Sequence, residues 1–234
     1  MMTHASAGSA KYGDACADYY DELYGAPKRA TILRLLEWVG TGEALELGIG
    51  TGRTAIPLAR EGVRISGIEI SAAMLEKLQS KPEGAAIPVI FSDFSNVRLS
   101  KSYSLIFALC STIHLLPSEQ AQTRCFRNLS LNLTSHGVFV VEAAVPDLVA
   151  NTNPAFPMEM PSGPSHRVRS SVSLATGHGN REYCVEMWRS SPEELDRMAR
   201  KANLELTARW ADWMNTPFCA GSPSHVSVYR RSNV

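Results

Sequence analysis

The stretch 46–53 reads Glu-Leu-Gly-Ile-Gly-Thr-Gly-Arg and places three glycines at alternate positions, Gly48, Gly50 and Gly52. They follow a short apolar run and precede residues with helical spacing. Glycine has no Cβ, so this turn can be tight and a ligand can approach its backbone. The N–H groups at the start of the following helix favour a negatively charged or electron-rich group. A glycine-rich turn between a strand and a helix therefore predicts a site for a nucleotide-like cofactor.

The residues on either side of the turn narrow the choice of cofactor. A dinucleotide fingerprint needs a further glycine three positions after Gly50, and that position holds Arg53. An acid, Glu46, lies instead inside the strand ahead of the turn. This pattern argues against a nicotinamide dinucleotide and indicates a different adenosine-containing ligand.

Two further acidic positions follow the next two expected strands. Glu69 ends the second strand, where a carboxylate can accept hydrogen bonds from ribose hydroxyls. Asp93 follows the third strand and is flanked by Phe94, a pair that suits the amino group and the ring of an adenine. All these positions lie at the C-terminal ends of strands, the edge at which α/β sheets bind ligands.

At this point the chain resembles the class I S-adenosylmethionine-dependent methyltransferases of the bacterial small-molecule type, over about residues 17 to 231. The matching segments are 46–52, 67–71 with Met74, 92–94, 105–116, 188–195 and 225–229. The resemblance implies S-adenosyl-L-methionine as the cofactor and methyl transfer as the reaction. The implied cofactor contacts are Glu46, Gly48, Gly50 and Gly52 for the methionine end, Glu69 for the ribose, Asp93 and Phe94 for the adenine, and the backbone of Ala108 and Leu109 for the amino group.

Three more residues of the matching region are expected near the cofactor, and some assignments have structural alternatives. Tyr20 resembles a residue of the helix that folds over the cofactor in related enzymes, and a core tyrosine is the alternative. Ile70 and Met74 belong to the second motif, although Met74 also suits plain core packing. Asp93 also suits the role of a turn-former.

His114, just past the fourth strand, is the candidate catalytic residue. In-line alignment of nucleophile, methyl carbon and sulfur can supply much of the acceleration, so the protein need add only a base if the acceptor must lose a proton. Histidine titrates near neutral pH and suits that task. A histidine that only shapes the pocket is the alternative. Acceptor specificity is expected from residues 12–24, the proline-rich segment 151–166, and residues near Trp188 and Trp213.

The order of the expected elements predicts the fold. Strands alternate with helices in a rhythm that implies right-handed crossovers and a mostly parallel sheet. Together with the resemblance, this order implies an α/β, Rossmann-like class I methyltransferase fold with a mostly parallel seven-stranded sheet, an antiparallel C-terminal hairpin and a small inserted β element. Expected strands are 44–47, 63–70, 87–91, 104–109, 138–143, 168–174, 181–188, 204–211 and 225–230, and expected helices are 54–61, 72–80, 120–133 and 191–203, with helical pieces in 18–39.

Composition sets the remaining expectations. Lysine and arginine (23) balance aspartate and glutamate (23), which argues against a nucleic-acid partner. No leader or membrane span of about 18 apolar residues is visible, and no Cys/His spacing predicts a metal. We expect a cytoplasmic protein, with a homodimer as the candidate assembly, a flexible N-terminus (1–16) and one methyltransferase domain (17–231) in which 143–190 form a lid or acceptor-side insertion.

The predicted function is methyl transfer to an oxygen or nitrogen of a small molecule. Two alternatives stay open from the sequence. One is a carbon methyltransferase or another S-adenosylmethionine-using enzyme on the same fold. The other is a non-catalytic cofactor-binding regulator.

Overall fold

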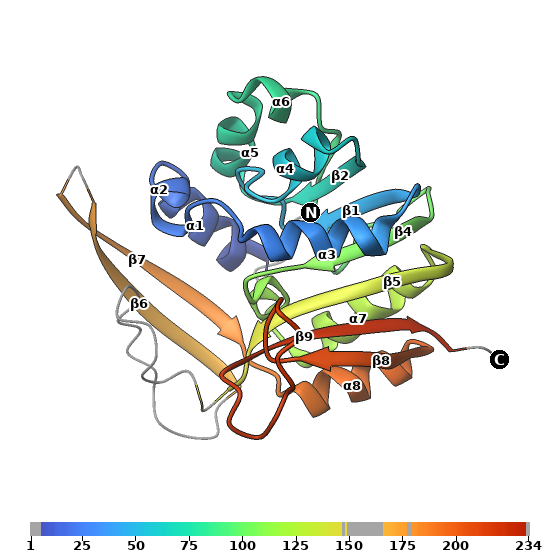
Figure 1. Cartoon of the computed structure of the whole chain (residues 1–234). Coiled ribbons are helices and arrows are strands. Elements are labelled where there is room, and N and C mark those ends of the chain that lie inside the picture. The colour runs from blue at the N-terminus through green and yellow to red at the C-terminus, as the bar shows by residue number, and fades with distance from the viewer. Residues whose placement is uncertain (1–5, 147, 149–165, 177–178, 233–234) are drawn as a thin grey trace.

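The computed structural model describes residues 6–146, 148, 166–176 and 179–232, with the backbone path alone for 6–9 and 172–176 (Figure 1). The proline-rich segment 151–166 therefore lies outside the described residues, except for His166. Within the described ranges no helix combines the length and the apolar character needed to cross a membrane.

A seven-stranded sheet forms the centre of the molecule, in the order β3-β2-β1-β4-β5-β9-β8. Its strands are β1 (Glu43–Leu47), β2 (Arg64–Glu69), β3 (Val89–Phe91), β4 (Tyr103–Ala108), β5 (Leu133–Ala144), β8 (Leu204–Trp210) and β9 (Ser224–Arg231). The pairs β1–β2, β1–β4, β2–β3 and β4–β5 are parallel, whereas β9 runs antiparallel to both β5 and β8. The predicted mostly parallel sheet with an antiparallel C-terminal hairpin is confirmed.

A second, two-stranded sheet extends from one end of the central sheet (Figure 1). It pairs β6 (Arg167–Thr176) with β7 (Gly179–Trp188) in antiparallel register. This hairpin is the predicted small inserted β element. Figure 1 shows it reaching past the edge of the main sheet toward the N-terminal helices.

Helices pack on both faces of the central sheet (Figure 1). They are α1 (Ser6–Cys16), α2 (Tyr20–Tyr24), α3 (Arg29–Val39), α4 (Ala55–Arg60), α5 (Ala72–Gln79), α6 (Pro82–Ala85), the 3₁₀ turn η1 (Thr112–Leu115), α7 (Glu119–Ser130) and α8 (Pro192–Lys201). Alternating side chains of each strand supply two cores. Phe139 packs edge-on against Phe126 of α7, while its neighbour Val140 lies in the opposite core with Leu35 of α3.

Residues 6–16, part of the segment 1–16 that we expected to be flexible, form a helix. This helix, α1, packs against α5 and β7. Cys16 and Ala17 are buried, and the Tyr12 ring lies 5.5 Å from the ring of Tyr183 on β7. This helix has few apolar residues, so the sequence gives little sign of it. Its stability comes from tertiary contacts rather than from a long amphipathic face.

Candidate active site

The glycine turn joins β1 to α4 in a conformation that other residues would strain. Gly48, Gly50 and Gly52 all have positive φ, at 64°, 56° and 81°. A Cβ on Gly48 would lie 2.8 Å from Thr112 Cγ2, closer than carbon atoms pack. The N–H of Ile49 donates to the carbonyl of Ile68, which ties the turn to β2. The three glycines thus allow a tight turn at the C-terminal edge of the sheet.

Glu69 binds the backbone around this turn. Its Oε2 accepts from the Gly50 N–H at 2.8 Å, and its Oε1 accepts from the N–H groups of Ile70 and Ser71 at 2.8 and 2.9 Å. Burial raises the pKa of this carboxyl, and the three N–H groups oppose the rise. A carboxylate offers about four acceptor positions, so these bonds leave room for one ribose hydroxyl rather than two while the turn keeps this conformation.

Glu46 is a buried acid with an unused oxygen. Its side chain is 6 % exposed and its Oε2 has no hydrogen-bond partner. Burial raises the pKa of Glu46 to about 8, although the charge of Arg53 acts in the opposite direction. A buried acceptor without a donor is costly, and an ammonium group on a ligand would satisfy it. This orphaned oxygen fits the methionine end of S-adenosylmethionine.

The residues expected at the adenine have roles within the protein itself. Asp93 Oδ1 accepts from the Ser95 N–H at 2.8 Å, the contact of a turn-former. Phe94 is buried in the core on the α7 side. Met74 is buried beside Cys16 and Tyr183, and its sulfur also lies next to Gly50.

Helices α1 and α2 (residues 6–24, here the N-terminal strap) lie against the turn. Asp21 accepts from Thr51 Oγ1 and from Lys81 Nζ, each at 2.5 Å, and Lys81 also donates to the Thr51 carbonyl. The ring of the expected lid residue Tyr20 packs at a tilt against Tyr24, with 4.4 Å between ring centroids. Burial raises the Tyr20 pKa well above its ordinary value.

A second group of polar residues lies at the ends of β4 and β5. Glu142 of β5 accepts from the Cys110 N–H at 3.0 Å and from Trp213 Nε1 at 2.8 Å. Arg53 Nη2 lies 2.9 Å from Cys110 Sγ, and its charge interacts with both Glu46 and Glu142. Trp213, which was expected near the acceptor, thus contacts Glu142 at the end of β5. Leu109, one residue before Cys110, is buried and its carbonyl accepts from the Thr112 N–H.

Sequence reasoning missed Glu142 and used Arg53 only to exclude a dinucleotide. Glu142 stands alone among the apolar residues of 138–144. An acid near the end of a buried strand is unfavourable unless it has partners, and that signal was available in the sequence.

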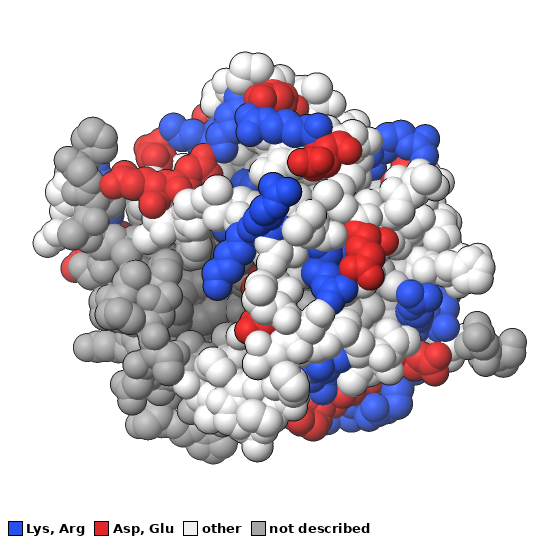
Figure 2. Space-filling view, in the orientation of Figure 1, with Lys and Arg blue, Asp and Glu red and all other residues white. Residues whose placement is uncertain are grey.

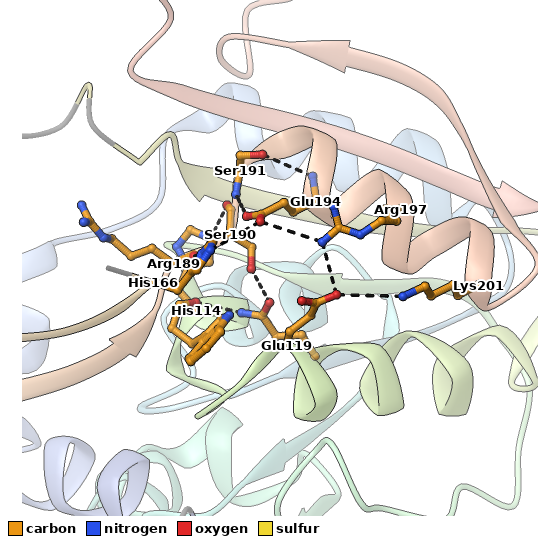
Figure 3. A network of polar contacts seen from close by, with 11 residues as sticks. His114, Glu119, His166, Arg189, Ser190, Ser191, Glu194, Arg197 and Lys201 are labelled. Carbon is orange, nitrogen blue, oxygen red and sulfur yellow. Dashed lines mark hydrogen bonds and ion pairs between the residues drawn. The ribbon is translucent and has the colours of Figure 1, made fainter. Parts of the chain in front are cut away.

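His114 lies in η1 and contacts the short segment that connects β7 to α8. Its ring is 2 % exposed, and Nε2 lies 3.2 Å from the Ser190 carbonyl (Figure 3). Gln122 donates to the carbonyls of Ile113 and Trp188, and Ser190 Oγ donates to Gln122 Oε1 at 2.6 Å. Burial lowers the pKa of His114 to about 4. The neutral ring therefore donates from Nε2 to Ser190, which suits a structural bond better than proton uptake at neutral pH.

The part of the chain that the structure describes holds no group of three or more His, Cys, Asp or Glu side chains arranged to bind a metal.

Comparison with known proteins identifies the family of the chain. Residues 44–137 match the family model described as "Methyltransferase domain". The chain is 31 % identical to the CcbJ methyltransferase from Streptomyces caelestis, with a TM-score of 0.79 and coverage of 96 % of this chain and 99 % of that one.

Two more distant relatives are named for methylation at nitrogen. The cypemycin N-terminal methyltransferase of Streptomyces is 22 % identical over 84 % of this chain and 89 % of its own. The glycopeptide N-methyltransferase MtfA, solved with S-adenosylmethionine and with sinefungin, shares the fold at a TM-score of 0.65, with 16 % and 14 % identity and coverage of 92 % of this chain and 91 % of its own.

The CcbJ match spans nearly the whole of both chains, and the glycine turn and its acids lie within the matched domain model. The protein belongs to the class I S-adenosylmethionine-dependent methyltransferases and uses S-adenosylmethionine.

Proposed function

We propose that this protein transfers a methyl group from S-adenosylmethionine to the nitrogen of a small-molecule amine. The observation that carries the cofactor part is the buried, unpaired Glu46 Oε2 beside the glycine turn. Nitrogen is favoured over the oxygen acceptor that the sequence leaves open, because the cypemycin enzyme and MtfA are both named as N-methyltransferases.

We assign the binding roles from the family resemblance and from the position of each group. Glu46 accepts from the cofactor's ammonium group, and Glu69 accepts from a ribose hydroxyl through its remaining acceptor position. Arg53 is the cation placed to meet the cofactor's carboxylate. Asp93 and Phe94 border the adenine, and Ile70 and Met74 line the ribose side. Tyr20, on the N-terminal strap, covers the methionine end.

Positioning is the main catalytic contribution of the chain. Bound S-adenosylmethionine would supply a methyl group on a positively charged sulfur. That sulfur is a good leaving group once the lone pair of the acceptor is aligned with the methyl carbon. The protein holds acceptor and cofactor in line and excludes water, and orientation of this kind can account for several powers of ten in rate. His114 acts here as a positioning residue. With a pKa of about 4 it is a weak base, and its Nε2 is engaged by Ser190.

A product assay tests the proposal. The purified protein is incubated with S-adenosylmethionine and a panel of matched primary and secondary amines and alcohols, and products are analysed by mass spectrometry. We expect S-adenosylhomocysteine to form together with an amine that has gained one CH₂. The Glu69→Ala variant serves as the control without cofactor binding. Methylation of alcohols or of carbon alone would contradict the nitrogen assignment, and cofactor binding without turnover on any acceptor would favour a regulator.

A further inference from the structure

We propose that Glu142 is the carboxylate that binds the acceptor as a positively charged amine. This inference rests on the proposed function and names the group that would select an amine. It concerns the region of β4 and β5, next to the cofactor contacts.

The order of the strands separates the two halves of the site. The expected adenine, ribose and methionine contacts follow β3, β2 and β1, which are consecutive neighbours in the sheet. The next strands are β4, which Cys110 follows by two residues, and then β5, which carries Glu142 near its C-terminal end. A cofactor that extends from β3 to β1 directs its reactive end toward β4 and β5. Glu142 lies on that side.

The backbone around Glu142 is built in an unusual conformation. Cys110 and Ser111 both have positive φ, 50° and 61°, in a chain segment without glycine. Left-handed residues of this kind cost about 1 kcal/mol or more each. The conformation aims the Cys110 N–H at the Glu142 carboxylate and the Ser111 N–H at the Glu142 carbonyl, and Ser111 Oγ accepts from the Ala144 N–H. The end of β4 thus wraps around the end of β5 at Glu142.

The carboxylate is oriented but not saturated. Trp213 Nε1 donates to Oε1, and Oε2 accepts from the Cys110 N–H and, at 3.9 Å, from Cys110 Sγ. A carboxylate has about four acceptor positions, so one, on Oε1, remains for a ligand. The side chain is only partly buried, so a ligand can reach it. Figure 2 shows a hollow near the middle of this face of the molecule, with acidic side-chain atoms beside it.

The charges near Glu142 favour a cationic ligand once the cofactor is bound. Arg53 interacts with both Glu46 and Glu142 in the ligand-free protein. The cofactor brings a carboxylate for Arg53 and an ammonium for Glu46. Glu142 is then left as an anion that the acceptor must neutralise, and a protonated amine does so with charge-assisted hydrogen bonds. Before methyl transfer the bound ammonium passes one proton to the Glu142 carboxylate, which frees the nitrogen lone pair for attack on the methyl carbon.

Sinefungin tests this inference without knowledge of the acceptor. It is an analogue of S-adenosylmethionine in which a carbon bearing an amino group replaces the methylated sulfur, so its extra ammonium points toward the acceptor side. S-adenosylhomocysteine has no such group. The affinity ratio of the two ligands, measured by calorimetry, therefore reports the charge on the acceptor side.

We expect Glu142→Gln to weaken sinefungin binding about tenfold or more, the loss of one hydrogen bond to a charged group. Binding of S-adenosylhomocysteine should change less than about twofold. Trp213→Phe is the matched control. It removes a donor from the same carboxylate but keeps the charge, so the affinity ratio should stay near that of the wild type.

The remaining outcomes are decisive. An unchanged ratio in Glu142→Gln would overturn the inference, and so would equal loss of both ligands, since Glu142 would then serve the cofactor. If the wild type binds neither ligand, the proposed function itself fails. A thermal unfolding scan confirms that the variants are folded before the ratios are compared.

Discussion

Glu46→Gln should change how the stability of the cofactor-free protein depends on pH. The folded protein holds the proton of this buried acid up to a pKa of about 8, whereas the ordinary value is 4.5. Between these values the unfolded chain releases a proton that the folded chain keeps, so wild-type stability falls as pH rises. Each pH unit in this interval corresponds to about 1.4 kcal/mol, or about 5 kcal/mol over the whole interval. Glutamine does not titrate and carries no such loss.

The assay is urea unfolding of both proteins at pH 5, 6, 7 and 8. Other titrating groups contribute equally to both, so the difference between the two free energies of unfolding isolates Glu46. We expect the free energy of unfolding of the variant, relative to that of the wild type, to rise by about 1.4 kcal/mol per pH unit up to pH 8 and no further. A difference that stays constant from pH 5 to 8 would refute the assignment of a raised pKa. The variant should also bind S-adenosylhomocysteine more weakly at pH 8, because it lacks the anion for the ligand's ammonium.

The other predictions concern the turn, the strap, η1 and α8. Glu69→Ala removes the acceptor of three N–H groups and should weaken S-adenosylhomocysteine binding at least about 100-fold by calorimetry, with the fold retained by circular dichroism. Asp21→Asn loosens the N-terminal strap from the turn and should therefore speed release of S-adenosylhomocysteine about tenfold, measured by stopped-flow displacement. The control is Asp18→Asn, which removes an exposed ion pair and should change the release rate little. His114→Asn should lower turnover without removing a limb from the pH–rate profile between pH 6 and 9; loss of such a limb would restore the base role. Ser191→Ala removes the capping box of α8 and should cost about 1 kcal/mol in urea unfolding.

Local patterns in the sequence carry the proposed cofactor half of the site. Alternating glycines, an acid ahead of them and an acid at the end of the next strand are consecutive features of the chain. Their positions follow from the rule that parallel strands end at one edge of a sheet. The helix beginning at Ser191 was equally readable, because cap, N1 proline and acidic first turn are adjacent in sequence.

The acceptor side depended on contacts between distant segments and was harder to predict. Trp213 meets Glu142 across 71 positions of sequence, and no local pattern encodes that pairing. The left-handed pair Cys110–Ser111 lacks the glycine that usually signals such a conformation. Helix α1 was missed because its stability comes from Ser71, Tyr183 and other partners far along the chain. From the sequence alone, the residue type of His114 indicated a catalytic base. Only its burial and its contact with the Ser190 carbonyl indicate that it makes a structural hydrogen bond.

The most direct measurement is a calorimetric titration of the wild type and Glu69→Ala with S-adenosylhomocysteine and, separately, with NAD. We predict that the wild type binds one S-adenosylhomocysteine per chain, that Glu69→Ala loses this binding while remaining folded, and that NAD binds to neither. Absence of S-adenosylhomocysteine binding to the wild type, or equal affinity in Glu69→Ala, would contradict the cofactor site described at the glycine turn.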